Sequence, residues 1–133
     1  MRGLAVALLA LALAAAGCSS TMDDVIKSRE DGTAAVYPCA AETAWNAATD
    51  VLWEATNVNP VEHRDRGYVC VMGGLGDDET FICVWITPTK LAGWTNVAVV
   101  TRRANGFQMG KVLDDETFHA EFIRKAKIPA PKE

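Results

Sequence analysis

The sequence lacks several patterns on which common enzymes and nucleic-acid-binding proteins depend. It contains only two histidines, His63 and His119, which cannot by themselves form a three-histidine zinc site. It has no Cys-x-x-Cys motif, so no local signature of thiol redox chemistry is present. Acidic residues, not Lys-Ser or Lys-Thr, follow the glycine-rich stretch 73–76, which excludes a nucleotide cradle of the P-loop type. Lys and Arg number 13 against 17 Asp and Glu, which argues against nucleic acid as a partner.

The chain also lacks an apolar run long enough to span a bilayer. After Met1-Arg2, residues 3–17 are uncharged and consist almost entirely of Leu, Ala and Val. This run is shorter than the roughly 20 residues that a transmembrane helix needs. A short positive start followed by such a run is typical of an export signal. We therefore expect residues 1–17 to be a signal peptide.

Cys18 directly follows small residues at the end of this apolar run. The stretch 15–18, Ala-Ala-Gly-Cys, resembles the bacterial lipobox, although Ala15 stands where Leu is usual. The resemblance implies cleavage before Cys18 and acylation of its thiol and amine. Ser19 follows, and this resembles sorting to the outer membrane. The alternative is ordinary cleavage after Ala16, which would leave a soluble periplasmic protein with a free Cys18.

Cleavage before Cys18 would leave 116 residues, which is enough for one domain with a modest core. Without Arg2, this part of the chain carries twelve basic and 17 acidic side chains, a net charge of −5. Such an acidic domain is not expected to lie flat on anionic lipid.

Residues 18–33 are polar and predict a flexible tether after the lipidated cysteine. A coil of this length has a root-mean-square reach of about 20 Å. The alternative is a short ordered helix around Val25 and Ile26. We place one domain at 34–127 and a proline-rich, disordered tail at 128–133.

The domain alternates apolar and polar residues in a pattern that predicts an α+β fold. Residues 41–56 and 114–127 have helical spacing, with Asp114 or Asp115 as the cap of the second helix. Strands are predicted at 34–37, 58–63, 68–72, 80–87 and 95–102. A run of strands after one helix favours an antiparallel meander sheet.

The central hairpin can be read in register if its loop lies at 73–79. Tyr68 then faces Trp85, and Cys70 faces Cys83. In a compartment that permits disulfides, this pairing predicts a Cys70–Cys83 bond. The alternatives are buried free thiols, or a bond from Cys39 to either cysteine. Three cysteines remain besides Cys18, so at least one is unpaired within the chain.

No residue pattern indicates catalysis. The sequence Asp-Asp-Glu-Thr-Phe occurs at 77–81 and at 114–118, but neither copy has the ligand spacing of a calcium loop. We read the first copy as a hairpin loop and the second as a helix start. A histidine-dependent hydrolase would need a triad assembled without any local signature. We therefore predict no catalytic residue, no cofactor and no metal, and expect both histidines at the surface.

Two groups of apolar residues could form a binding surface. Leu91 and Trp94 lie in a loop between predicted strands and could anchor a partner, unless Trp94 folds back onto the core. Tyr68 and Trp85 share one face of the hairpin and could line a small-ligand pocket. Both faces of the hairpin are apolar, so each is either covered or used for binding. Trp45 and Trp53 on the first helix are expected in the core.

The order of these segments resembles small bacterial lipoproteins of families without a known function. The resemblance rests on the lipobox and on four local patterns at 41–48, 67–69, 84–86 and 97–99. It spans residues 18–127 and implies a strand–helix–meander–helix domain at the cell envelope. We expect a non-enzymatic, lipid-anchored protein on the periplasmic face of the outer membrane, with an envelope protein as partner. A lipid-anchored small-ligand binder is the alternative.

Overall fold

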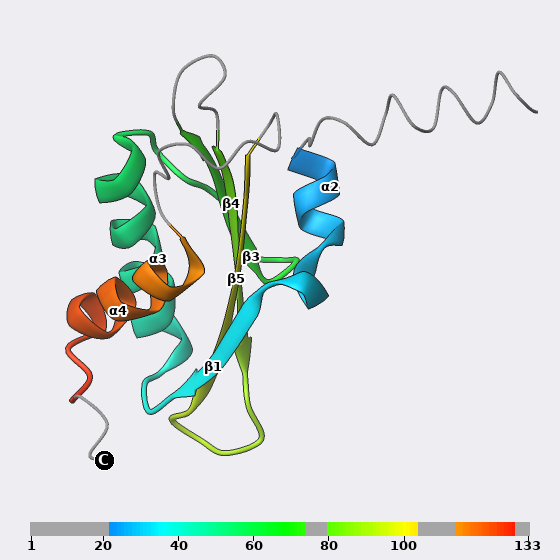
Figure 1. Cartoon of the computed structure of the whole chain (residues 1–133). Coiled ribbons are helices and arrows are strands. Elements are labelled where there is room, and N and C mark those ends of the chain that lie inside the picture. The colour runs from blue at the N-terminus through cyan, green and yellow to red at the C-terminus, as the bar shows by residue number, and fades with distance from the viewer. Residues whose placement is uncertain (1–21, 74–79, 104–113, 130–133) are drawn as a thin grey trace, which may run out of the picture.

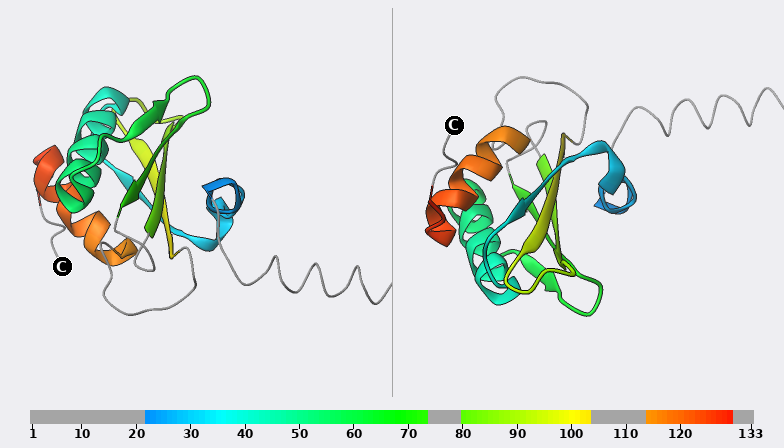
Figure 2. Two further views of the ribbon diagram at one scale, coloured as in Figure 1. Left: turned by 90° about the horizontal axis from the view of Figure 1, so that it is seen from above. Right: turned by 90° about the horizontal axis from the view of Figure 1, so that it is seen from below.

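A five-stranded antiparallel sheet lies between two layers of helix (Figures 1 and 2). The computed structural model describes residues 22–73, 80–103 and 114–129. The strand order is β1-β5-β4-β3-β2, so β2 to β5 form a meander and β1 is added beside β5. The elements are α2 (Met22–Lys27), η1 (Arg29–Asp31), β1 (Thr33–Tyr37), α3 (Ala41–Thr56), β2 (Val61–His63), β3 (Tyr68–Gly73), β4 (Thr80–Pro88), β5 (Thr95–Arg103) and α4 (Asp115–Ala126). The predicted α+β fold with an antiparallel meander is confirmed.

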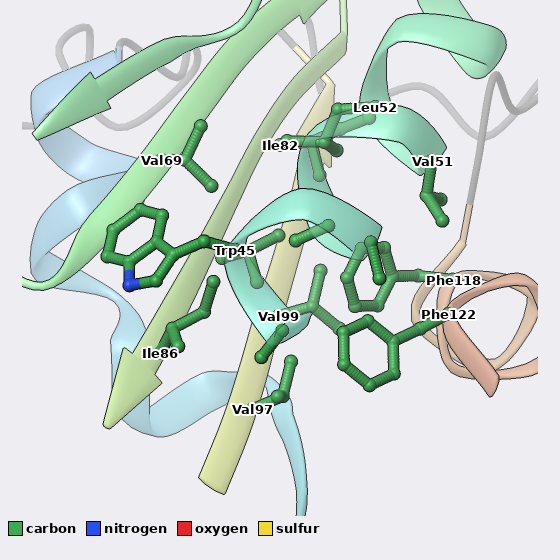
Figure 3. Close-up of a cluster of buried hydrophobic side chains, with 14 of the residues drawn as sticks. Trp45, Val51, Leu52, Val69, Ile82, Ile86, Val97, Val99, Phe118 and Phe122 are labelled. Carbon is green, nitrogen blue, oxygen red and sulfur yellow. The ribbon is translucent and has the colours of Figure 1, made fainter. Parts of the chain in front are cut away.

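The main core lies between the first face of the sheet and helices α3 and α4 (Figure 3). Alternate residues of β3, β4 and β5 point to this face, as the period of two in a strand requires. Phe118 and Phe122 of α4 are completely buried here, and Leu52 of α3 packs into the same cluster. The sheet residues of the cluster are Val69, Val71, Ile82, Val84, Ile86, Val97 and Val99.

The two long helices begin and end where local chemistry favours it. Asp114 caps α4, since its side chain accepts a hydrogen bond of 2.7 Å from the backbone N–H of Thr117. Helix α3 has the predicted bounds and ends at Asn57 in the left-handed conformation, whose N–H donates to the Trp53 carbonyl. The buried stripe of α3 includes Trp45, but Trp53 is 44% exposed. The expectation that Trp53 lies in the core is wrong, because it falls on the outer side of the helix.

The predicted register of the central hairpin is confirmed. Tyr68 pairs with Trp85, and Cys70 pairs with Cys83. The turn that precedes β3 uses Gly67 at φ 82°, and its N–H donates to the His63 carbonyl. Matched apolar pairs on both faces thus fix the alignment of β3 and β4.

Helix α2 covers part of the second face of the sheet (Figures 1 and 2). Val25 is completely buried, and Met22 and Ile26 pack against the same cluster as the Cys70–Cys83 pair. The prediction of a flexible tether over 18–33 is therefore wrong for residues 22–33, where the alternative of a short helix is found. A six-residue helix has little stability alone, so it is the burial of apolar side chains on the sheet that holds it.

Gly32 carries the chain from η1 into β1, against the backbone of β5. A Cβ atom at this position would lie 2.0 Å from the Val99 carbonyl oxygen and 2.5 Å from a Val100 methyl. Only glycine permits this approach. The crossing therefore fixes where α2 and η1 lie on the sheet.

Several expected features lie outside the described residues. They are the signal peptide 1–17, Cys18, most of the 73–79 hairpin loop and the end of the C-terminal tail. Among the helices that are described, none has the length and apolar content that crossing a bilayer requires.

Candidate binding surfaces

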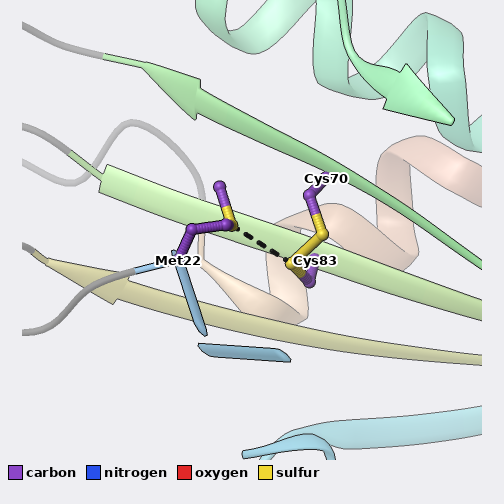
Figure 4. The surroundings of a disulfide bond; sticks show 3 residues. All are labelled: Met22, Cys70 and Cys83. Atoms are coloured by element: carbon purple, nitrogen blue, oxygen red, sulfur yellow. Dashed lines mark hydrogen bonds between the residues drawn. A yellow bond between two sulfur atoms is a disulfide. The ribbon is translucent and has the colours of Figure 1, made fainter. Parts of the chain in front are cut away.

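The Cys70–Cys83 disulfide joins β3 to β4 on the second face, as predicted (Figure 4). The two Cα atoms are 4.2 Å apart, the close approach that belongs to a non-hydrogen-bonded antiparallel pair. The Sδ atom of Met22 lies 3.5 Å from the Sγ atom of Cys83. The start of α2 is thus seated directly on the disulfide.

Tyr68 and Trp85, which were predicted from the sequence as possible binding residues, are both buried. Tyr68 is 7% and Trp85 5% exposed. The guanidinium of Arg29 in η1 lies 5.9 Å from the ring centre of Trp85 and donates to the Thr87 hydroxyl. His63 packs against Tyr68, with ring centres 4.8 Å apart. These two aromatic side chains are therefore part of a second small core and not a pocket wall.

Leu91 and Trp94 project from the connection between β4 and β5. Leu91 is 62% and Trp94 38% exposed. The Thr89 hydroxyl lies 3.0 Å from the Leu91 carbonyl and 2.9 Å from the Trp94 carbonyl, between which its one proton is shared, and it accepts from the Leu91 N–H. Gly93 at φ 82° completes the turn. The loop therefore presents apolar side chains on a backbone that its own hydrogen bonds hold in shape.

Val36 extends this exposed apolar surface along the edge of the sheet. It pairs with Asn96, two residues after Trp94, and its side chain is exposed. Alternation along the strands puts Val36 and Asn96 on the second face. We call Val36, Leu91 and Trp94 the hairpin patch. A five-residue strand in which Ala35 precedes Val36 and Tyr37 follows it gave no sequence signal that Val36 would be uncovered.

A second exposed pair, Val61 and Met72, lies at the other end of the same face. Val61 pairs with Cys70, and Met72 stands two residues further along β3. Val61 is 58% and Met72 46% exposed. We call these two residues the disulfide patch. Met72 pairs with Phe81, which is buried, and nothing in the sequence indicated that α2 would leave Met72 uncovered.

His119 links α4 to β1. Its Nε2 lies 3.2 Å from the Thr33 carbonyl, which can only accept, so Nε2 carries the proton. Its Nδ1, 2.5 Å from the Tyr37 hydroxyl, then accepts from that hydroxyl. Burial lowers the pKa of His119, and burial with a smaller contribution from Cys39 raises the pKa of Tyr37 to about 12. The expectation of a surface histidine is wrong here, because the ring is half-buried between two elements.

Both nitrogens of His119 have partners, the Thr33 carbonyl and the Tyr37 hydroxyl, so the ring joins α4 to β1. Cys39 is a free thiol, and burial raises its pKa, which disfavours the reactive thiolate. The second Asp-Asp-Glu-Thr-Phe copy is the start of α4. Within residues 22–73, 80–103 and 114–129, no group of three or more His, Cys, Asp or Glu side chains is placed to hold a metal ion.

Comparison of the chain with family models, curated proteins and solved structures finds no match.

Proposed function

We propose that this chain is a lipid-anchored, non-catalytic protein-binding module of the bacterial cell envelope. In this proposal Cys18 carries the acyl chains, and the domain faces the periplasm from the outer membrane. The lipobox-like stretch 15–18 supports the anchor. The Cys70–Cys83 disulfide supports an oxidising compartment.

The observation that carries the binding role is the hairpin patch. Leu91 and Trp94 are exposed together on a loop that Thr89 holds in shape, so little conformational entropy is lost when a partner binds. Aromatic side chains are enriched among the residues that dominate protein interfaces. The burial of Tyr68 and Trp85 argues against the alternative of a small-ligand pocket on the second face.

Site-specific photo-crosslinking in intact cells tests this role. A photoreactive phenylalanine derivative would replace Leu91 in the full chain, and the crosslinked product would be identified by mass spectrometry. The matched control places the same group at Val58, which is also an exposed apolar position but lies after α3. We expect one defined envelope protein to be crosslinked at position 91. The same crosslinked product should be absent when the photoreactive group is at position 58, and its amount should fall in the Trp94→Ala variant. Equal crosslinking at both positions would refute the proposal.

A further inference from the structure

We infer that the disulfide patch, Val61 and Met72, rests on the lipid bilayer when Cys18 is acylated. This inference depends on the proposed anchor and adds the orientation of the domain. It follows from where α2 is seated, from the length of chain before it, and from what α2 leaves exposed.

The first step is the position of α2. Met22 contacts Cys83 (Figure 4). Val25 is completely buried on the sheet. Ser28, which follows α2, donates to the Asp24 carbonyl, and Gly32 fixes the crossing to β1. The start of the described chain is therefore held against the disulfide.

The second step is the length of chain between the anchor and α2. Only Ser19, Ser20 and Thr21 separate Cys18 from Met22. Four residue steps span at most about 14 Å even when fully extended. A coil from 18 to 33 would have reached further and left the domain free to tumble. Acyl chains on Cys18 would instead hold the disulfide end of the sheet close to the lipid surface.

The third step is what that end of the sheet presents. Val61 pairs with Cys70 and lies two strands from Cys83, about 10 Å away at ordinary strand spacing. Met72 is equally near, and both side chains point to the face on which α2 lies. The side chain of Glu62 belongs to the opposite face, where it accepts from Thr49 and Arg64. Beside the anchor, the sheet itself therefore presents two apolar side chains, Val61 and Met72.

The expected occupant is a zwitterionic lipid surface. Asp23 and Asp24 in the first turn of α2 are exposed, and the acylated chain would be acidic, so anionic lipid would be repelled. The acyl chains would supply the membrane affinity, since two exposed side chains are too few. The disulfide patch would set which side of the domain faces the lipid.

The same orientation would leave the hairpin patch at the end of the sheet that is remote from the anchor. Five residue steps along β4 lead from Cys83 to Pro88, a distance of about 17 Å. The loop with Leu91 continues beyond that point, at the end of the sheet opposite the start of β4 (Figure 1). A membrane-facing end and a partner-facing end would then lie at opposite ends of one rigid sheet.

Methionine oxidation reports this orientation directly, because Met72 is a natural probe. The full chain, acylated in cells and verified by intact mass, would be placed in phosphatidylcholine vesicles and treated with hydrogen peroxide. The reference is a chain that begins at Ser19, mixed with the same vesicles. The matched control is Leu91→Met, which puts a methionine of similar exposure in the hairpin patch.

Since oxidation requires access to the sulfur, we expect Met72 to be oxidised about fivefold more slowly in the acylated chain than in the reference. The methionine of Leu91→Met should be oxidised at the same rate in both. Equal rates for Met72 in a verified acylated chain would overturn the orientation alone. A chain without acyl groups would overturn both the orientation and the proposed function.

Discussion

Removal of the Cys70–Cys83 disulfide should lower the free energy of unfolding by about 3 kcal/mol. The bond closes a loop with a sequence separation of 13 residues. In the chain-entropy account, a loop of this size removes about 10 cal/mol/K from the unfolded chain, or about 3 kcal/mol at room temperature. Domains of this size have roughly 5–15 kcal/mol in total, so the loss would be large.

The measurement is urea denaturation of the double variant Cys70→Ala, Cys83→Ala, followed by tryptophan fluorescence. Reduction of the unmodified protein gives an independent value that deletes no side chain. Cys39→Ala is the matched control, because Cys39 is a free and partly exposed thiol. Its stability should change by less than about 1 kcal/mol. If neither the double variant nor the reduced protein loses more than this control, the disulfide does not stabilise the fold as stated.

Three further perturbations address other parts of the structure. Gly32→Ala would place a Cβ atom against the Val99 carbonyl, so the free energy of unfolding should fall by about 1–3 kcal/mol; an unchanged urea midpoint would contradict the close crossing. Burial lowers the pKa of His119 in the folded chain. As the pH falls, the unfolded chain therefore binds a proton at this residue before the folded chain does. The free energy of unfolding should fall as the pH drops below about 6.5, the ordinary pKa of histidine, toward the lower pKa of the folded state. In urea titrations between about pH 7.5 and pH 5, His119→Asn should flatten this slope; a slope equal to that of the unmodified chain would refute the assignment. Leu91→Ala should change stability by less than about 0.5 kcal/mol, since the side chain is exposed; a larger loss in the same titration would show that Leu91 belongs to the core.

The elements with strong local patterns were predictable from the sequence. Helix α3 has six buried residues at helical spacing, and both of its ends fall where expected. The register of β3 and β4 followed from matching apolar residues on both faces, which also placed Cys70 opposite Cys83. These features depend on residues close in sequence, so a single chain carries the information.

Helix α2 was not predictable in the same way. Its six residues include only one that is fully buried, Val25, and the surrounding Ser, Asp and Lys residues are typical of a coil. What holds it is contact with Cys83, some sixty residues away in sequence. The burial of Tyr68 and Trp85 follows from the same long-range packing, as does the exposure of Met72.

The residues of the hairpin patch and of the disulfide patch could be predicted from the sequence only in part. Leu91 and Trp94 were identified correctly as a loop pair, because a turn sequence surrounded them. Val36 and Val61 are ordinary valines in strands, and the strand order places both on edge strands. The role of His119 required knowledge that α4 packs beside β1.

The most direct test of the anchored, disulfide-stabilised domain is the intact mass of the native protein extracted from membranes, with and without thiol alkylation. The account predicts a chain that begins at Cys18 and carries acyl groups. When this chain is unfolded without a reducing agent, only one thiol, that of Cys39, should react with the alkylating reagent. A chain that begins at Gly17 without acyl groups would contradict the anchor. Three alkylatable thiols in an acylated chain would keep the anchor and contradict the Cys70–Cys83 disulfide.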